Sequence, residues 1–150
     1  MTKARKKASH PWVAAATLCE NILEDKDNVM SIIRMVDLFN VPRPPEWDGK
    51  ENLQLLLNGL LAFKSGDVKG KRIVRIYGVS PKGKRQKLHE LSMDFLGGNT
   101  GVNLKLRMVF GFKTEGTHWL DVYVEKRLTT RIPITILFHE LVQPVAPAEK

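Results

Sequence analysis

The sequence predicts an all-β protein that folds as a single antiparallel β-sandwich of about eight strands. Apolar and polar residues alternate along most of the middle of the chain, which is the period of a strand with one buried face. Short turn sequences separate the alternating runs at regular intervals. The chain has 150 residues, of which 43% are hydrophobic, which suits one domain with its own core. The predicted strands are 12–23, 29–39, 53–63, 71–79, 86–95, 102–112, 117–125 and 131–138.

Two of these strands also fit helical spacing. In 12–23, small and apolar residues recur at intervals that could line one face of a helix. In 53–63 the leucines do the same, and Asp48 with Glu51 could form a capping box ahead of them. Leucine and phenylalanine equally fill one strand face of 53–63, with Gly59 as the only gap. Because a glycine inside a helix costs about 1 kcal/mol relative to alanine, we expect a strand there.

The later strands show the clearest alternation. In 102–112 every second residue, starting from Val102, is apolar, and in 131–138 isoleucines alternate with other residues. Pro133 lies within the last run and cannot donate a backbone hydrogen bond. We therefore expect this strand at a sheet edge, or with that position pointing outward.

The predicted core follows from the same alternation. Trp119 and Tyr123 should lie on the strand face opposite to Leu120 and Val122. The core is expected to include Leu104, Leu106, Met108, Phe110, Leu120, Val122, Ile132, Ile134 and Ile136.

Turn chemistry divides these runs. The sequence Ser-Pro-Lys-Gly at 80–83 is typical of a tight turn, because proline presets φ early in the turn and glycine allows a positive φ near its end. The sequence Gly-Gly-Asn-Thr-Gly at 97–101 is expected to be a flexible connection. The proline-rich segment 41–49 is expected to be the one long loop.

The domain organisation is expected to be a basic flexible arm at 1–11, the sandwich domain at 12–142 and a flexible tail at 143–150. The arm precedes an apolar run, as in a signal peptide, but that run has only nine residues and passes into Glu20. No apolar stretch reaches the length of about 18 residues that a membrane helix needs. Cys19 is the single cysteine, so a disulfide within the chain is excluded. A cytoplasmic protein without membrane contact is expected.

Residues for catalysis or metal binding do not form a recognisable pattern. The histidines are His10, His89, His118 and His139, and their spacing matches no helical zinc motif, so surface or packing roles are expected. Cys19 lies in an apolar run and is expected to be a packing residue. The sequence therefore predicts no catalytic residue, no cofactor and no metal.

The charge is the best remaining feature. The net charge is +8, and residues 61–113 carry twelve basic and three acidic side chains, a net +9. Antiparallel pairing of 71–79 with 86–95 would gather several cations at one end of a basic hairpin. Such a surface attracts an anionic partner, or it serves only as a solvated edge that prevents aggregation. The candidate residues for anionic-partner binding are Lys69, Lys71, Arg72, Lys82, Lys84, Arg85 and Lys87.

The order of several segments resembles a known family. These are Leu-Cys-Glu at 18–20, the apolar run 29–37, the turn at 80–83, the alternating run 116–125 and Ile-Pro-Ile at 132–134. Over about residues 12–138 the chain resembles a family of small bacterial proteins classed as a domain of unknown function. The resemblance implies a sandwich with an immunoglobulin-like topology, and it brings no catalytic motif.

The expected function is that of a non-catalytic binding or adaptor module. It would recognise a protein partner through edge strands, loops or the basic hairpin. One alternative is a nucleic-acid accessory protein that binds phosphate backbone through the hairpin and the N-terminal arm. Another is an enzyme of unknown class. The oligomeric state is left open by the sequence.

Overall fold

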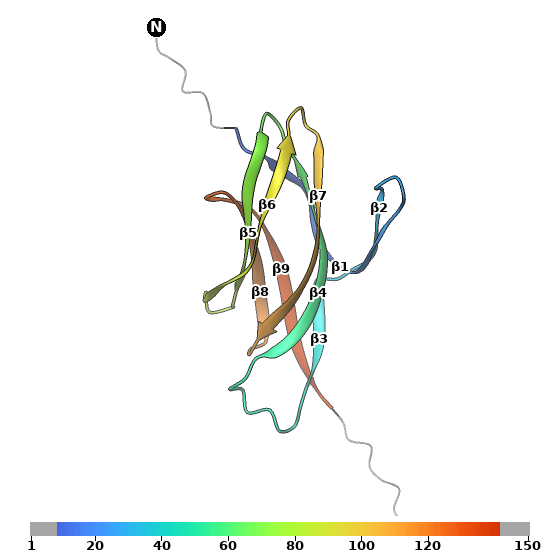
Figure 1. Ribbon diagram of the computed structural model, residues 1–150. Coiled ribbons are helices and arrows are strands. Elements are labelled where there is room, and N and C mark those ends of the chain that lie inside the picture. Colours follow the sequence, from blue (N-terminus) through green and yellow to red (C-terminus); the bar gives the residue numbers. More distant parts are fainter. Residues whose placement is uncertain (1–8, 142–150) are drawn as a thin grey trace, which may run out of the picture.

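The computed structural model describes residues 9–141, which form a β-sandwich (Figure 1). The predicted all-β sandwich is confirmed. Residues 1–8 of the predicted arm and the predicted tail at 143–150 lie outside the described residues. The strands of the described part are β1 (Trp12–Glu24), β2 (Met30–Met35), β3 (Leu38–Arg43), β4 (Leu53–Lys64), β5 (Lys69–Val79), β6 (Arg85–Leu96), β7 (Gly101–Phe112), β8 (Gly116–Val124) and β9 (Arg127–Glu140).

Two sheets face each other across the core. One has the order β2-β1-β4-β7 and the other the order β3-β9-β8-β5-β6. Neighbouring strands are antiparallel except β3 and β9, which pair in parallel. In immunoglobulin nomenclature, β4 and β7 occupy the positions of strands B and E, and β5, β8 and β9 those of C, F and G. The topology is therefore immunoglobulin-like, as the sequence resemblance implied.

The prediction of one strand at 29–39 is wrong. This segment forms β2 and then β3, which belong to different sheets. Arg34 has a left-handed backbone with φ of 48°, and just after it the amide of Val36 donates to the carbonyl of Leu18. The amide of Thr135 in β9 donates to the carbonyl of Asp37, which binds the chain to the second sheet. Both strands are at most half-buried, and their half-buried positions, Met30 and Ile32 in β2 and Phe39 and Val41 in β3, are out of phase across the crossing.

The predicted long loop at 41–49 is also partly wrong, because Val41, Pro42 and Arg43 continue β3 beside β9. β3 contacts only the later half of β9, from Thr135 onward. Pro133 lies opposite Trp119 of β8 in the earlier half of β9, where β3 does not pair with it. The proline therefore occupies a local edge of a strand that is central elsewhere.

The core lies between the inward faces of both sheets. Most of the predicted core residues are buried, while Leu104 and Met108 are half-buried and pack against the core. Trp119 and Tyr123 are only partly buried, as expected for the opposite face of β8. Cys19 is buried as well, and burial raises the pKa of its thiol, which agrees with a packing role.

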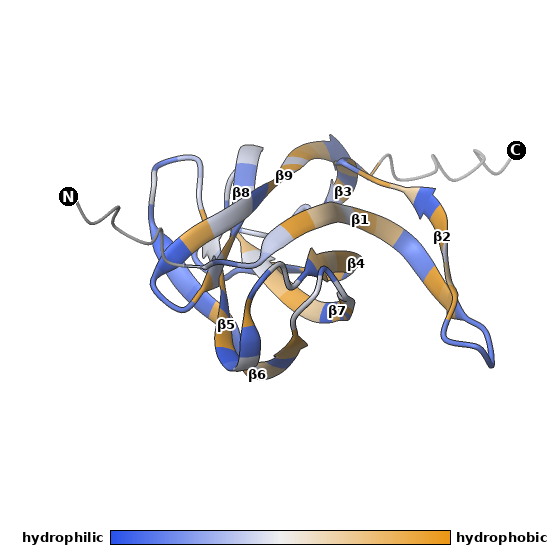
Figure 2. Cartoon of the chain, turned by 90° about the horizontal axis from the view of Figure 1, so that it is seen from above, coloured by the Kyte–Doolittle hydropathy of each residue, from blue (hydrophilic) through white to orange (hydrophobic). Residues whose placement is uncertain are grey.

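The end of β1 and all of β2 project away from the sandwich, as both Figure 1 and Figure 2 show. Several large apolar side chains of this projecting hairpin are exposed, among them Leu23, Val29 and Met35. At its base the carboxylate of Glu20 forms an ion pair with Arg34 at 3.2 Å. Near its tip Glu24 forms an ion pair with Lys105 of β7, which connects the projecting end of β1 with the other edge strand of the same sheet.

His10 attaches the start of the described chain to β9. Its Nε2 lies 3.0 Å from Oγ1 of Thr129. Burial, together with the positive charge of Arg127, lowers the pKa of the His10 imidazole from its ordinary value of 6.5. The unfolded chain therefore protonates at His10 more readily than the folded chain. This contribution to stability is present above a pH of about 6.5 and is lost as the pH falls below it.

We expect acidification from about pH 7.5 to about pH 5.5 to destabilise the wild type more than a His10→Gln variant, since glutamine does not titrate. Urea unfolding of both proteins at several pH values measures the difference, and an NMR titration of the His10 ring locates its pKa. Parallel pH profiles for the two proteins would show that the His10 contact does not contribute.

Candidate functional site

The structure divides the predicted basic residues into two groups. Lys69, Lys71 and Arg72 lie at the start of β5, where they pair with the end of β6. The other four lie at the β5–β6 turn, which Figure 1 shows at the opposite end of the hairpin. Since β5 has eleven residues, the two groups are separated by roughly 30 Å. The prediction that pairing gathers these cations at one end holds for Lys82, Lys84, Arg85 and Lys87 only.

The β5–β6 turn is held by a compact set of hydrogen bonds. The amide of Ser80 donates to the carbonyl of Lys84 at 2.9 Å, and the amide of Gly83 donates to the carbonyl of Ser80 at 2.8 Å. The amide of Lys84 donates to Oγ of Ser80 at 3.0 Å. Gly83 has φ of 86°, a conformation that glycine adopts without strain. The turn is thus fixed, and it is exposed from residue 81 to residue 87, as predicted.

Two of the four turn-end cations are engaged by neighbouring side chains. The guanidinium of Arg85 lies 4.2 Å from the ring centre of Tyr77 and 5.2 Å from that of Tyr123, on the outer face of the five-stranded sheet. Lys87 forms an ion pair with Glu90 at 3.2 Å. Hydrogen bonds from Arg75 and then Lys87 lower the pKa of the Glu90 carboxyl. Arg85 and Lys87 therefore have stabilising partners within the fold.

The other two cations, Lys82 and Lys84, form no salt bridge with any residue between 9 and 141. Both line a pocket of about 330 Å³ that is bounded by the β5–β6 turn, the end of β7 and the turn before β8. A third cation, Lys113, enters from the β7–β8 turn. No carboxylate lines the pocket. Its lining residues are Asn52, Gly78, Ser80, Lys82, Lys84, Gln86, Phe110, Gly111, Lys113, Thr114 and His118.

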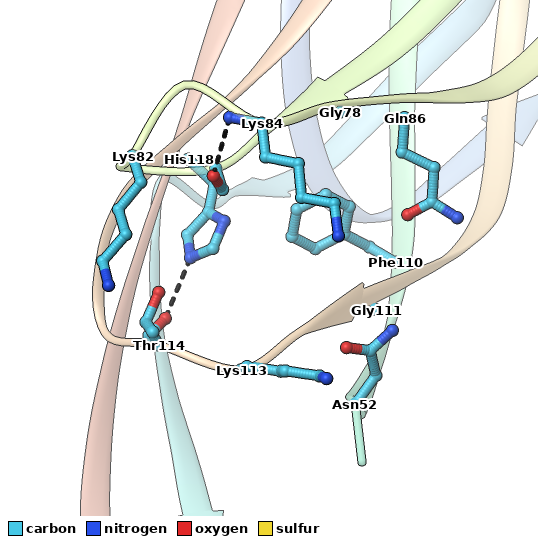
Figure 3. Close-up of a pocket in the computed structure, with 11 residues that line it drawn as sticks. Asn52, Gly78, Lys82, Lys84, Gln86, Phe110, Gly111, Lys113, Thr114 and His118 are labelled. Atoms are coloured by element: carbon cyan, nitrogen blue, oxygen red, sulfur yellow. Dashed lines mark hydrogen bonds between the residues drawn. The ribbon is translucent and has the colours of Figure 1, made fainter. Parts of the chain in front are cut away.

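Figure 3 shows how the side chains surround this space. Lys84 and Gln86 extend from the β5–β6 side, and Asn52 and Lys113 extend from the opposite side. The ring of Phe110 lies between them. The pocket is therefore polar and cationic at its rim and aromatic at its wall.

The aromatic wall is rigidly packed. Phe110 and His118 are 3% and 2% exposed, and their rings meet edge to face with centres 5.5 Å apart. Nε2 of His118 lies 2.9 Å from the carbonyl oxygen of Thr114, which fits a donated hydrogen bond and fixes the ring. The expectation of a packing role for His118 is met, and the same ring also lines the pocket. The residues between 9 and 141 hold no group of three His, Cys, Asp or Glu suited to a metal ion.

Sequence reasoning missed Lys113, Asn52 and the aromatic wall. These residues come together through strand pairing, because Val79 at the end of β5 pairs with Trp119 near the start of β8. That pairing places the 80–84 turn and the 113–116 turn at the same end of the sandwich. The pairing order of distant strands cannot be read from alternation alone.

Comparison with known proteins supports the fold. No known family model matches the sequence, and no curated protein matches it. Among solved structures, a β-glucosidase from Listeria innocua is similar with a TM-score of 0.54 and 8% identity, over 90% of this chain and 17% of that one. β-Glucosidase 3B from Thermotoga neapolitana is similar with a TM-score of 0.50 and 10% identity, over 85% of this chain and 16% of that one.

A further similar structure is an immunoglobulin-like protein from Pseudomonas aeruginosa, with a TM-score of 0.40 and 14% identity, over 86% of this chain and 98% of that one. The chain spans less than a fifth of the length of either glucosidase. At 8% and 10% identity the two glucosidase similarities support the fold alone. Within residues 9–141 there is no helix long and apolar enough to cross a membrane.

Proposed function

We propose that this chain is a non-catalytic binding module that recognises an acidic surface of a partner protein with the turn end of the β5–β6 hairpin. The supporting observation is that Lys82, Lys84 and Lys113, from two turns, line one pocket whose lining includes no carboxylate. Several like charges at one end of the molecule create a positive field, and this field attracts an anionic partner. The proposal includes membership of the bacterial family that the sequence resembles and a cytoplasmic location.

The rigidity of the turn favours recognition over a purely solvated edge. Hydrogen bonds around Ser80 fix the backbone that carries Lys82 and Lys84. A partner therefore orders only the lysine side chains when it binds, which lowers the entropic cost of association. The cations at the start of β5 form no ion pair in the described part of the chain either, but there a carboxylate is nearby, because Lys71 is paired in the sheet with Asp94.

We expect the double reversal Lys82→Glu/Lys84→Glu to abolish partner capture while the fold persists. Both residues are exposed and without an ion pair in the described part of the chain, so each reversal should change stability by no more than about 0.5 kcal/mol. Affinity capture from the host, followed by mass spectrometry at two salt concentrations, measures the loss, and urea unfolding checks the fold.

The matched control is Lys69→Glu/Lys71→Glu, which makes the same change of charge at the other end of the hairpin. Equal loss of capture in both double variants would mean that only the net charge matters, which contradicts the proposal. Mixed-sequence DNA that binds the wild type and dissociates steeply with salt would instead support the nucleic-acid alternative.

A further inference from the structure

We propose that the pocket between the β5–β6 turn and the β7–β8 turn binds a small organic anion, a carboxylate or phosphate monoester carried on a flat, ring-sized apolar body. This site goes beyond the proposed function and does not depend on a partner protein. Its volume of about 330 Å³ accommodates one ring with an anionic group. That size lies at the lower end of the range of small-molecule sites.

The cations define the charge of the ligand. Lys82 and Lys84 come from one turn and Lys113 from another, and all three line the pocket. In Figure 3 Lys84 and Lys113 lie on the side of Phe110 and Asn52, whereas Lys82 extends beside Thr114. None of them forms a salt bridge with residues 9–141, which is also true of other exposed cations such as Lys69 and Lys71, but these three line one pocket that has no carboxylate in its lining. An anion in the pocket would provide the missing counter-charge. Hydrogen bonds between ionised groups are about twice as strong as neutral ones.

The wall defines the shape of the ligand. Phe110 and His118 line the pocket, and because they are 3% and 2% exposed they offer a flat ring only small areas of contact at the bottom of the site. The pocket also depends on two glycines. A Cβ at Gly78 would lie 3.0 Å from Cε2 of Phe110, and one at Gly111 would lie 3.1 Å from Nδ2 of Asn52. Neither glycine has a positive φ within the described chain, so the backbone does not require glycine there. A side chain at Gly78 would press on Phe110 and Leu88, and one at Gly111 would displace Asn52, so either would change the lining of the pocket.

The carboxamides add directional groups. Asn52 and Gln86 line opposite sides of the pocket (Figure 3), and neither side chain is hydrogen-bonded to another residue in the 9–141 region. Their N–H groups can donate to ligand oxygens beside the ammonium groups. Because the β5–β6 turn and the His118 ring are already fixed by hydrogen bonds, the site is formed before a ligand enters.

The test is an NMR titration of the full chain with phenyl phosphate, benzoate, inorganic phosphate and phenol. Phenyl phosphate or benzoate should saturably shift the amides of 80–86 and 110–118. The probe with the higher affinity shows which anionic group the site prefers, and binding of either probe supports the site. Phenol and inorganic phosphate should each bind at least about tenfold more weakly, because phenol lacks the anionic group and inorganic phosphate lacks the ring. No saturable binding of the first two, or equally tight binding of inorganic phosphate, would overturn the proposal.

Two variants test the residues. Lys84→Met/Lys113→Met should weaken phenyl phosphate about tenfold, while the control Lys69→Met/Lys71→Met should stay within about twofold, as expected for distant exposed charges. Gly111→Val narrows the pocket without changing charge, and it can be accommodated because the crowded group is the exposed Asn52 side chain. Equal weakening by both lysine pairs would show unspecific attraction and overturn the site.

Gly111→Val also separates this inference from the proposed function. It should weaken binding of the aromatic anion and leave partner capture unchanged, since the three lysines remain. If the wild type binds none of the probes while capture still depends on Lys82 and Lys84, the small-molecule site is wrong and the protein-binding proposal stands. If the probes bind as expected and partner capture does not depend on Lys82 and Lys84, the small-molecule site stands and the protein-binding proposal is wrong.

Discussion

Replacement of Phe63 by alanine is expected to lower the free energy of unfolding by about 3–5 kcal/mol, the largest loss among single truncations in this core. Phe63 lies in β4 and is 0% exposed. Its ring meets that of Phe95 in β6 edge to face, with centres 6.0 Å apart. Because β4 and β6 belong to different sheets, this contact joins the two layers of the sandwich. Truncation leaves a cavity between the sheets that neither layer can close alone.

A Leu56→Ala variant provides the matched control. Leu56 lies in the same strand but is 49% exposed, so its truncation should cost less than about 1 kcal/mol. Urea unfolding followed by tryptophan fluorescence measures both variants. Since domains of this size have a total stability of about 5–15 kcal/mol, Phe63→Ala should leave a visibly unstable protein. Similar losses for the two variants would mean that the sheets do not pack as described.

Alternation was sufficient to predict the strands but not their partners. β7 and β8 were predicted almost to the residue, because each buries one face along its full length. The crossing from β2 to β3 was missed, since its signal is the backbone of Arg34 and not a change in polarity. Apolar residues are frequent on both sides of the crossing, so composition does not mark it, and the position of β3 depends on its pairing with β9, about a hundred residues away.

One part of the candidate site could likewise be predicted from the sequence, and another part could not. The exposed, basic turn at 80–87 could be predicted, because proline and glycine at fixed positions determine a turn locally. The arrival of Lys113 and Phe110 beside it could not, because that depends on the pairing of β5 with β8 and on how the two sheets stack. The separation of Lys69 from Lys82 follows from the length of β5. Counting residues along the hairpin from the turn would have placed Lys69 at the far end.

Gly59 shows how a residue that seemed to interrupt a pattern can be required by the packing. It was the only gap in the leucine-rich face of 53–63. In the structure it pairs with Leu18 on one side and Leu106 on the other, both of which are buried. A Cβ at this position would lie 2.8 Å from the carbonyl oxygen of Thr17 and 3.0 Å from Cδ2 of Leu18. The space that a side chain needs is already filled by β1.

We therefore expect Gly59→Val to destabilise the protein by about 3 kcal/mol, and Gly59→Ala by a smaller amount of the same sign. Intrinsic preference predicts the opposite sign, since replacing a strand glycine that has an ordinary φ should stabilise by about 0.5–1 kcal/mol. Packing should prevail because the nearest atom belongs to the backbone of β1 and cannot rotate away. The control is Gly101→Val in β7, where an added Cβ would meet the mobile end of Lys64 at 3.4 Å and the carbonyl oxygen of Phe63 at 3.9 Å, an ordinary contact distance. Urea unfolding should place Gly59→Val well below the wild type and Gly101→Val at or above it. Equal stability of the two valine variants would show that β1 does not pack this closely on β4.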